Sequence, residues 1–227
     1  MPCGKTAAEK SMRVFESLLV PTPSIPVAIA GRLVVVLLIL SAICLVLASM
    51  AMPSSYSWMS NAISESAAQG VYCAWVARLG FLLFGFAIVW LASILKPYWA
   101  RGTYWMHLGF AVFMLSTAAF SHKPWLTELP FDLTEDILHS ITATGMGFAF
   151  TLGVLVRFFQ REKNQTVYKI GDVIAIIIAS SLSPLGEIWP GVAGLLQRII
   201  FLVAYCWYSS EALNGWRLPN TLSIARG

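Results

Sequence analysis

Six apolar stretches alternate with short polar segments along the chain. Each stretch has 18 to 24 residues, which is enough for an α-helix to cross a hydrocarbon core of roughly 30 Å. The stretches are 33–52, 72–95, 103–120, 137–159, 170–190 and 192–213. Because the segments between them are short, neighbouring helices must pack antiparallel. The pattern predicts an all-α polytopic membrane protein with six transmembrane helices in an antiparallel bundle.

One membrane domain over residues 27–215 accounts for nearly all of the chain. Residues 1–26 form a cytoplasmic leader whose apolar positions recur at helical spacing, as in a short interfacial helix. Residues 216–227 form a cytoplasmic tail. No segment between the apolar stretches is long enough for a separate soluble domain.

Lysine and arginine are distributed unequally between the two sides of the predicted membrane. Twelve of the fifteen fall in the termini, in alternate gaps or at helix ends on one side: Lys5, Lys10, Arg13, Arg32, Lys96, Arg101, Arg157, Arg161, Lys163, Lys169, Arg217 and Arg226. The loops of the opposite side hold only Lys123. Positively charged loops remain in the cytoplasm, so both termini are predicted to be cytoplasmic. Short loops and this charge pattern suit a bacterial inner membrane.

The composition excludes a soluble domain, because 58% of the residues are hydrophobic and 11% are charged, against about 25% charged in ordinary globular chains. The net charge of +4 does not indicate nucleic-acid binding, since the basic residues are expected to face anionic lipid headgroups. The four cysteines fit neither a zinc motif nor a redox pair.

Two arginines lie inside predicted helices. Arg78 and Arg198 are both seven residues in from the outer side, about 10 Å deep at 1.5 Å per residue. Charges within a membrane are costly and often functional, and Glu65 and Glu187 are the nearest candidate partners. One interpretation is a ligand-binding pocket for an anionic headgroup at the outer leaflet. The other is a structural network that fixes the helices to the outer loops.

A second group of polar residues surrounds the outer loop at 121–136. Asp136 and His139 are three apart and share a helical face, and His122 begins the same loop. Two histidines and a carboxylate can ligate zinc with a position open for water, while Ser64 or Glu65 supplies a nucleophile or base. These residues and Asp136 are the catalytic candidates. The alternative is that the acidic residues serve the helix N-terminus, with Thr134 as N-cap.

The fifth stretch contains two further polar features. Asp172 begins it on the inner side, where a carboxylate suits a helix N-terminus. Ser180, Ser181 and Ser183 precede Pro184, and proline interrupts the hydrogen bonding of a helix. A kinked or broken helix that lines a cavity is the expectation there.

Several of these residues together resemble a known family. Tyr56 to Trp58 is followed by Asn61 to Glu65, then by Ala77 to Phe81, and later by His139 and Gly194 to Arg198. This arrangement resembles the bacterial and archaeal membrane family catalogued as domain of unknown function 998, over residues 30–215. The chain departs from the family pattern at Ser66, Ala67 and Gln197. The resemblance implies six spans and an inner-membrane location, and no activity.

Three functions fit the sequence. The first is a non-catalytic protein that binds membrane lipids or a protein partner at its outer-leaflet side, alone or as a homo-oligomer. The second is a metal-dependent membrane hydrolase acting on a lipid at the periplasmic face through His122, Asp136 and His139. The third is a small transporter. Whether the protein is an enzyme is left open by the sequence.

Overall fold

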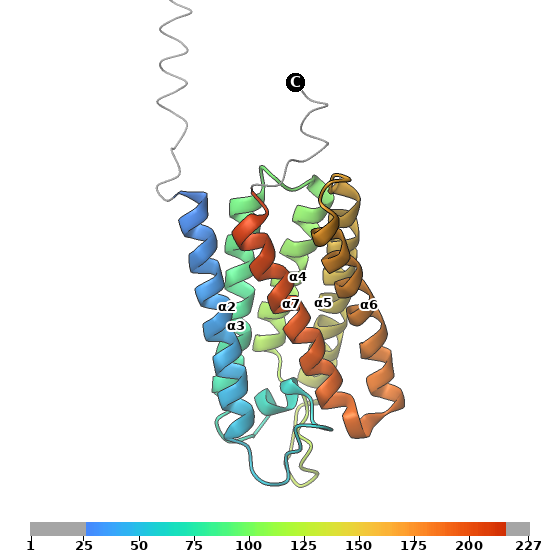
Figure 1. Cartoon of the computed structure of the whole chain (residues 1–227). Helices are drawn as coiled ribbons and strands as arrows, with labels where there is room; N and C mark the ends of the chain where they lie inside the picture. The colour runs from blue at the N-terminus through green and yellow to red at the C-terminus, as the bar shows by residue number, and fades with distance from the viewer. Residues whose placement is uncertain (1–25, 217–227) are drawn as a thin grey trace, which may run out of the picture.

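Each apolar stretch forms one long helix, and the six helices run antiparallel to their neighbours in chain order (Figure 1). The structure, a computed structural model, describes residues 26–216. The long helices are α2 Val27–Met50, α3 Ala74–Leu95, α4 Arg101–Ala119, α5 Leu133–Gln160, α6 Thr166–Ile188 and α7 Ala193–Asn214, and two short 3₁₀ helices are η1 Ile63–Ala67 and η2 Pro190–Val192. The interfacial helix expected in the leader lies outside the described residues, as does nearly all of the C-terminal tail.

The two ends of the bundle differ in what they carry. The start of α2 and the end of α7 lie together at one end, called the terminal end below (Figure 1). The segment 51–73, which contains η1, and the loop 120–132 lie at the other end, called the loop end below.

Prolines and capping side chains set the helix boundaries more closely than the ends of the apolar stretches do. Helix α2 begins at Val27, directly after Pro26, because proline lacks an N–H and is tolerated where a helix starts. Helix α5 begins at Leu133, and Asp132 caps it by accepting from the Thr134 N–H at 2.6 Å. The prediction that Thr134 is the N-cap is therefore wrong.

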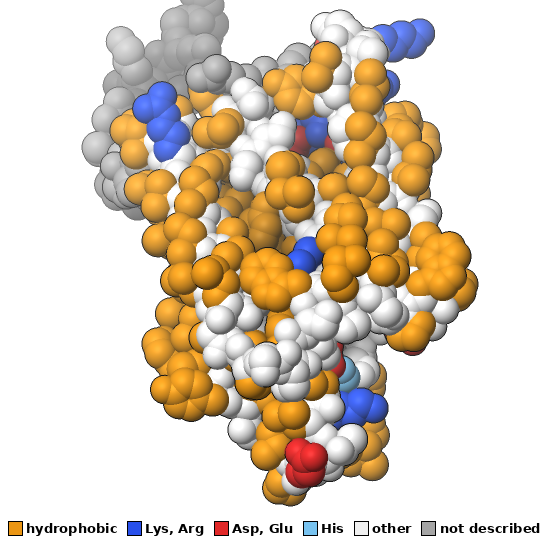
Figure 2. All heavy atoms as spheres, turned by 60° about the horizontal axis from the view of Figure 1, so that its bottom comes forward, with side chains coloured by type: hydrophobic (Ala, Val, Ile, Leu, Met, Phe, Trp, Pro, Cys, Tyr) orange, Lys and Arg blue, Asp and Glu red, His pale blue; other side chains and the backbone are white. Residues whose placement is uncertain are grey.

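Within residues 26–216, five helices are long and apolar enough to cross a membrane: α2, α3, α5, α6, and α7 together with η2. Helix α4 has 19 residues and is less apolar, because it carries groups such as Arg101 and His107. Hydrophobic side chains cover most of the surface in Figure 2. On α2 alone, Val36, Leu47 and Met50 are 50%, 52% and 67% exposed. A helix that is apolar on every side fits a lipid environment, so the chain is a polytopic membrane protein.

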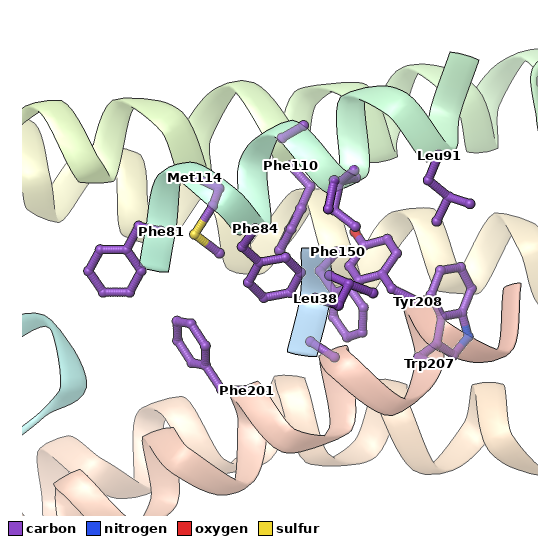
Figure 3. Close-up of a cluster of buried hydrophobic side chains, with 14 of the residues drawn as sticks. Leu38, Phe81, Phe84, Leu91, Phe110, Met114, Phe150, Phe201, Trp207 and Tyr208 are labelled. Atoms are coloured by element: carbon purple, nitrogen blue, oxygen red, sulfur yellow. The ribbon is translucent and has the colours of Figure 1, made fainter. Parts of the chain in front are cut away.

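The core is centred on aromatic rings from α3, α4, α5 and α7 (Figure 3). Phe84 stacks on Tyr205 with ring centroids 4.4 Å apart, and it meets Phe110 edge-on at 5.5 Å. Small residues allow the helices to approach closely: a Cβ added to Gly31 would lie 2.1 Å from the carbonyl oxygen of Ala212. This contact fixes α2 against the end of α7.

Helix α6 is the least buried of the long helices, with Asp172 and Ala175 as its only buried residues. Pro184 lies inside α6, which is a single continuous helix from Thr166 to Ile188. The Ser180 hydroxyl donates to the carbonyl of Ile176 at 2.7 Å. The expected break is therefore absent, although α6 does line a cavity.

Candidate ligand-binding site

A cavity of about 370 Å³ lies among the helices in the half of the bundle nearest the loop end. Its walls come from α3 to α7 and from η1. The polar groups that line it are Ser64, His122, His139, Ser140, Thr144, Ser183, Glu187 and Gln197. This volume falls in the range of roughly 300–1,000 Å³ that is typical of small-molecule sites.

The cavity changes from polar to apolar along the bundle axis. Its deeper lining is Phe84, Phe110, Met114, Phe150, Phe201 and Ala204, several of which Figure 3 shows converging between the helices. Ser140 and Phe150 both belong to the lining from α5 and stand roughly 15 Å apart along the helix axis at 1.5 Å per residue. The site therefore suits a molecule with one polar end and one apolar end.

Helices α5 and α6 leave the cavity open at the side. Thr144 and Gly147 on α5, and Ser183 and Glu187 on α6, line the cavity and are also exposed. A Cβ added to Gly147 would meet no heavy atom within 4 Å. The opening is therefore on the side of the helix bundle, and the sides of a bundle face lipid in a membrane protein.

Two histidines and an aspartate meet at the polar end of the cavity. His122 Nδ1 lies 2.5 Å from Asp136 Oδ1, which also accepts from the Lys123 N–H at 2.9 Å. The His139 ring stacks on His122 with centroids 5.2 Å apart and 16° between the ring planes. His139 Nδ1 donates to the carbonyl of Phe120 at 2.9 Å. The sequence correctly grouped these three residues.

Gln69, which the sequence analysis passed over, fixes the backbone around His122. Its side-chain Nε2 donates to the carbonyls of Ser121 and Asp132, at 3.0 and 2.9 Å. Its side-chain oxygen accepts from the Asp132 N–H at 2.6 Å, and its own backbone N–H donates to the His122 carbonyl at 3.0 Å. Gln69 thereby joins the two segments of the loop end.

Hydrogen bonds already occupy several of the groups that the zinc hypothesis assigns to the metal. Among residues 26–216, no group of three or more His, Cys, Asp or Glu side chains is placed to hold a metal ion. Asp136 points its Oδ1 at His122 Nδ1, and His139 commits its Nδ1 to a backbone carbonyl. The zinc hypothesis stays a prediction, while the hydrogen bonds favour a role in proton transfer.

The segment around η1 places Ser64 in the cavity and turns Glu65 away from it. Glu65 accepts from the Ala62 N–H at 2.5 Å and from Asn61 Nδ2 at 3.2 Å, so its carboxylate serves its own loop. Gln197 Oε1 accepts from the Ile63 N–H at 2.6 Å. An amide has one oxygen and one NH₂ group, so the NH₂ of Gln197 remains available to a ligand.

Arg198 anchors the loop end. Its Nη1 donates to the carbonyls of Trp58, Asn61 and Gly194, each at 2.9 Å. Its Nη2 donates to Tyr56 Oη at 2.8 Å. These bonds pin segment 51–62 to α7 and use most of the guanidinium's donors.

Arg78 makes a similar but weaker contact, with Nε donating to the Ala67 carbonyl at 3.2 Å. Within residues 26–216, neither Arg78 nor Arg198 forms an ion pair, so the expected partners Glu65 and Glu187 are wrong. Neither arginine lines the cavity. Their ligand-binding role stays a prediction that the geometry does not favour.

A network of buried charges at the terminal end was missed by the sequence analysis. Glu211 on α7 accepts from Arg157 Nε at 3.1 Å, from Arg161 Nη2 at 2.7 Å and from Trp99 Nε1 at 2.9 Å. Asp172 binds Arg161 Nε, and it accepts from Trp207 Nε1 at 2.8 Å. The network joins α5, α6, α7 and the segment between α3 and α4.

The expected roles of three of these residues are wrong. Arg157 and Arg161 were expected to face headgroups, but they are 0% and 5% exposed. The Asp172 carboxylate was expected to stabilise the N-terminus of its helix, but it forms an ion pair with Arg161. Burial opposes the charge of Arg161, yet its bonds to Asp172 and the attraction of Glu211 raise the pKa of its guanidinium. Glu211 is the only acidic residue in α7, and a lone carboxylate in an apolar helix was the available signal.

The match to a known protein family covers most of the membrane domain. The family model described as "Protein of unknown function (DUF998)" matches residues 33–213, well over half of the chain. The chain belongs to this family. No curated protein and no solved structure matches it. Membership in DUF998 assigns no activity, so the site must be interpreted from its own chemistry.

Proposed function

We propose that this DUF998 protein binds a membrane lipid, or an amphiphile of the same kind, in the cavity at its loop end. The observation that carries the proposal is the polarity of that cavity, polar near the loop end and aromatic further in. Lipid-like ligands match such a gradient because their acyl chains bury apolar area while their headgroups keep polar partners.

The charge distribution supports an outer position for this cavity. Lys96, Arg101, Lys163 and Lys169 gather near the terminal end, whereas Lys123 is the lysine of the loop end. By the positive-inside rule the terminal end is cytoplasmic. With α4 counted as a sixth span, the protein lies in a bacterial inner membrane and its cavity opens beside the outer leaflet.

The polar groups of the cavity favour a headgroup that both accepts and donates hydrogen bonds. The NH₂ of Gln197 and the hydroxyl of Ser64 are donors, and the exposed carboxylate of Glu187 attracts a cation. A zwitterionic amine headgroup such as that of phosphatidylethanolamine combines both features. Arg78 and Arg198 have no part in this set.

Filling the cavity tests the proposal. Gly147→Leu places a side chain in the lining where a Cβ meets nothing within 4 Å, so the fold tolerates it. Gly171 on α6 also has open space around its Cβ but does not line the cavity, which makes Gly171→Leu the matched control. The measurement is native mass spectrometry of each protein released from micelles doped with phosphatidylethanolamine.

We expect one retained lipid in the wild type and in Gly171→Leu, and its loss in Gly147→Leu. Equal retention by all three proteins would place the lipid outside the cavity and refute the proposal. Absence of lipid from the wild type would refute it as well.

A further inference from the structure

We propose that the polar end of the cavity is also a hydrolytic site, in which His122 acts as general base and acid on a carboxylic ester and Asp136 positions it. This inference rests on the proposed function, because the ester belongs to the bound amphiphile. It differs from the metal-dependent hydrolase that the sequence suggested, since here the proton is moved by a side chain.

The first support is the orientation of the His122 ring. A carboxylate only accepts hydrogen bonds, so the 2.5 Å contact with Asp136 Oδ1 requires the proton on His122 Nδ1. The lone pair of the neutral ring is then on Nε2. Asp136 is itself 8% exposed and is held by the Lys123 N–H. A buried, fixed carboxylate behind an imidazole sets its tautomer and stabilises the imidazolium that forms.

The second support is access to the cavity. His122 lines the cavity and its side chain is 25% exposed, while Asp136 stands behind it and is not part of the lining. Within the described part of the chain, His122 Nε2 has no hydrogen-bond partner. The stacked His139 ring limits the tilt of His122. A general base must lie within hydrogen-bond reach of the proton that it takes. Of His122 and Asp136, only His122 lines the cavity and can contact the ligand.

The nucleophile is assigned to water. Ser64 lines the same cavity, but among residues 26–216 its hydroxyl makes no hydrogen bond to either histidine. A serine nucleophile normally hydrogen-bonds to its base. The NH₂ of Gln197, left over when its oxygen binds Ile63, is a donor for the carbonyl oxygen as negative charge develops there.

The reaction balances as an ester hydrolysis. Water attacks the carbonyl carbon, a C–O bond forms, and His122 Nε2 takes a proton from the water. The tetrahedral intermediate then breaks its bond to the alkoxide, and His122 returns the proton to that oxygen. The products are a carboxylic acid and an alcohol, and no oxidant or reductant is consumed.

The experiment uses the full chain in vesicles of phosphatidylethanolamine and phosphatidylglycerol, with fatty-acid release followed by mass spectrometry in the presence of EDTA. We expect release by the wild type and by Gly171→Leu. His122→Gln should lower kcat by at least about 10²-fold, the lower end for loss of general acid–base catalysis. Asp136→Asn should lower kcat with little change in KM, and Asp136→Glu should restore part of it. Ser64→Ala should raise KM, because its hydroxyl lines the cavity as a donor to the headgroup, but should leave kcat nearly unchanged, because the nucleophile is water.

Parallel lipid-retention measurements separate the two proposals. Retained lipid without fatty-acid release by the wild type overturns the hydrolytic site and leaves the binding site standing. Absence of both lipid and release overturns both. Activity that disappears in EDTA and returns with zinc overturns the side-chain mechanism. Loss of kcat in Ser64→Ala while lipid is still retained overturns the assignment of water as the nucleophile. Equal loss of lipid and activity in His122→Gln also counts against catalysis by His122.

Discussion

Removing the Glu211 carboxylate should destabilise the protein by several kcal/mol, about the cost of breaking a buried ion pair from one side. Glu211 is 1% exposed and accepts hydrogen bonds from two arginines and a tryptophan. Glu211→Gln keeps the shape but leaves Arg157 without a carboxylate partner and Arg161 with Asp172 alone. Breaking a buried pair from one side costs about 3–5 kcal/mol, because an uncompensated charge then remains in a medium that solvates it poorly.

The assay is thermal unfolding in a fixed detergent at one heating rate, since unfolding of such proteins is often irreversible. With about 2–4 °C per kcal/mol for a chain of this size, Tm should fall by about 6–20 °C. Glu128→Gln, at an exposed glutamate of the loop end, is the matched control and should leave Tm nearly unchanged. If both variants behave alike, the network does not hold the terminal end together and the reasoning fails. In a double-mutant cycle, Arg157→Gln and Glu211→Gln should show a coupling of about 0.5–3 kcal/mol.

Three further changes test the packing around the site. Gly153→Ala should lower the stability by about 1–3 kcal/mol, because the added Cβ lies 2.7 Å from His107 Cε1 and overpacks the contact. Gly147→Ala has open space around its Cβ and should raise Tm slightly. A higher Tm for Gly153→Ala than for Gly147→Ala would contradict this packing. Arg198→Lys cannot reproduce the four bonds of the guanidinium fork, so hydrogen exchange should quicken in segment 51–67 and stay slow elsewhere; uniform exchange would refute the anchor. Asp132→Ala removes the cap of α5 and should cost about 0.5–2 kcal/mol in thermal unfolding; no loss of Tm would show that the cap is dispensable.

The helices were predictable because membrane-length apolar runs leave little choice of structure. The predicted stretch 137–159 lies within α5, Leu133–Gln160. Boundaries were less predictable, since they depend on caps such as Asp132 rather than on hydropathy. Proline at 184 also did not break α6, which is continuous from Thr166 to Ile188; membrane helices tolerate proline better than the sequence pattern suggests.

The site could be predicted only where the residues are close in sequence or share a loop. His122, Asp136 and His139 border one loop, and their grouping followed from that alone. Gln197 binds Ile63, which is 134 positions away in the sequence. The partners of Glu211 are 50 to 112 positions away, and hydropathy does not reveal contacts of this kind. The charge pattern wrongly predicted that Arg157 faces lipid headgroups, because a sequence does not distinguish a buried arginine from one that binds headgroups.

The aromatic layer beneath the cavity has a consequence for how a ligand reaches it. Phe110 and Phe150 line the cavity and also contact the Tyr208 ring, at 5.1 and 5.6 Å, and the Tyr208 hydroxyl lies 3.0 Å from His107. The cavity is thus closed toward the terminal end and open between α5 and α6. The lipid proposed for this cavity would arrive by diffusing in the plane of the bilayer, so its occupancy would depend on its mole fraction in the surrounding leaflet. Titrations against an aqueous concentration would misstate the affinity, and bilayers of different fluidity should change the rate of exchange.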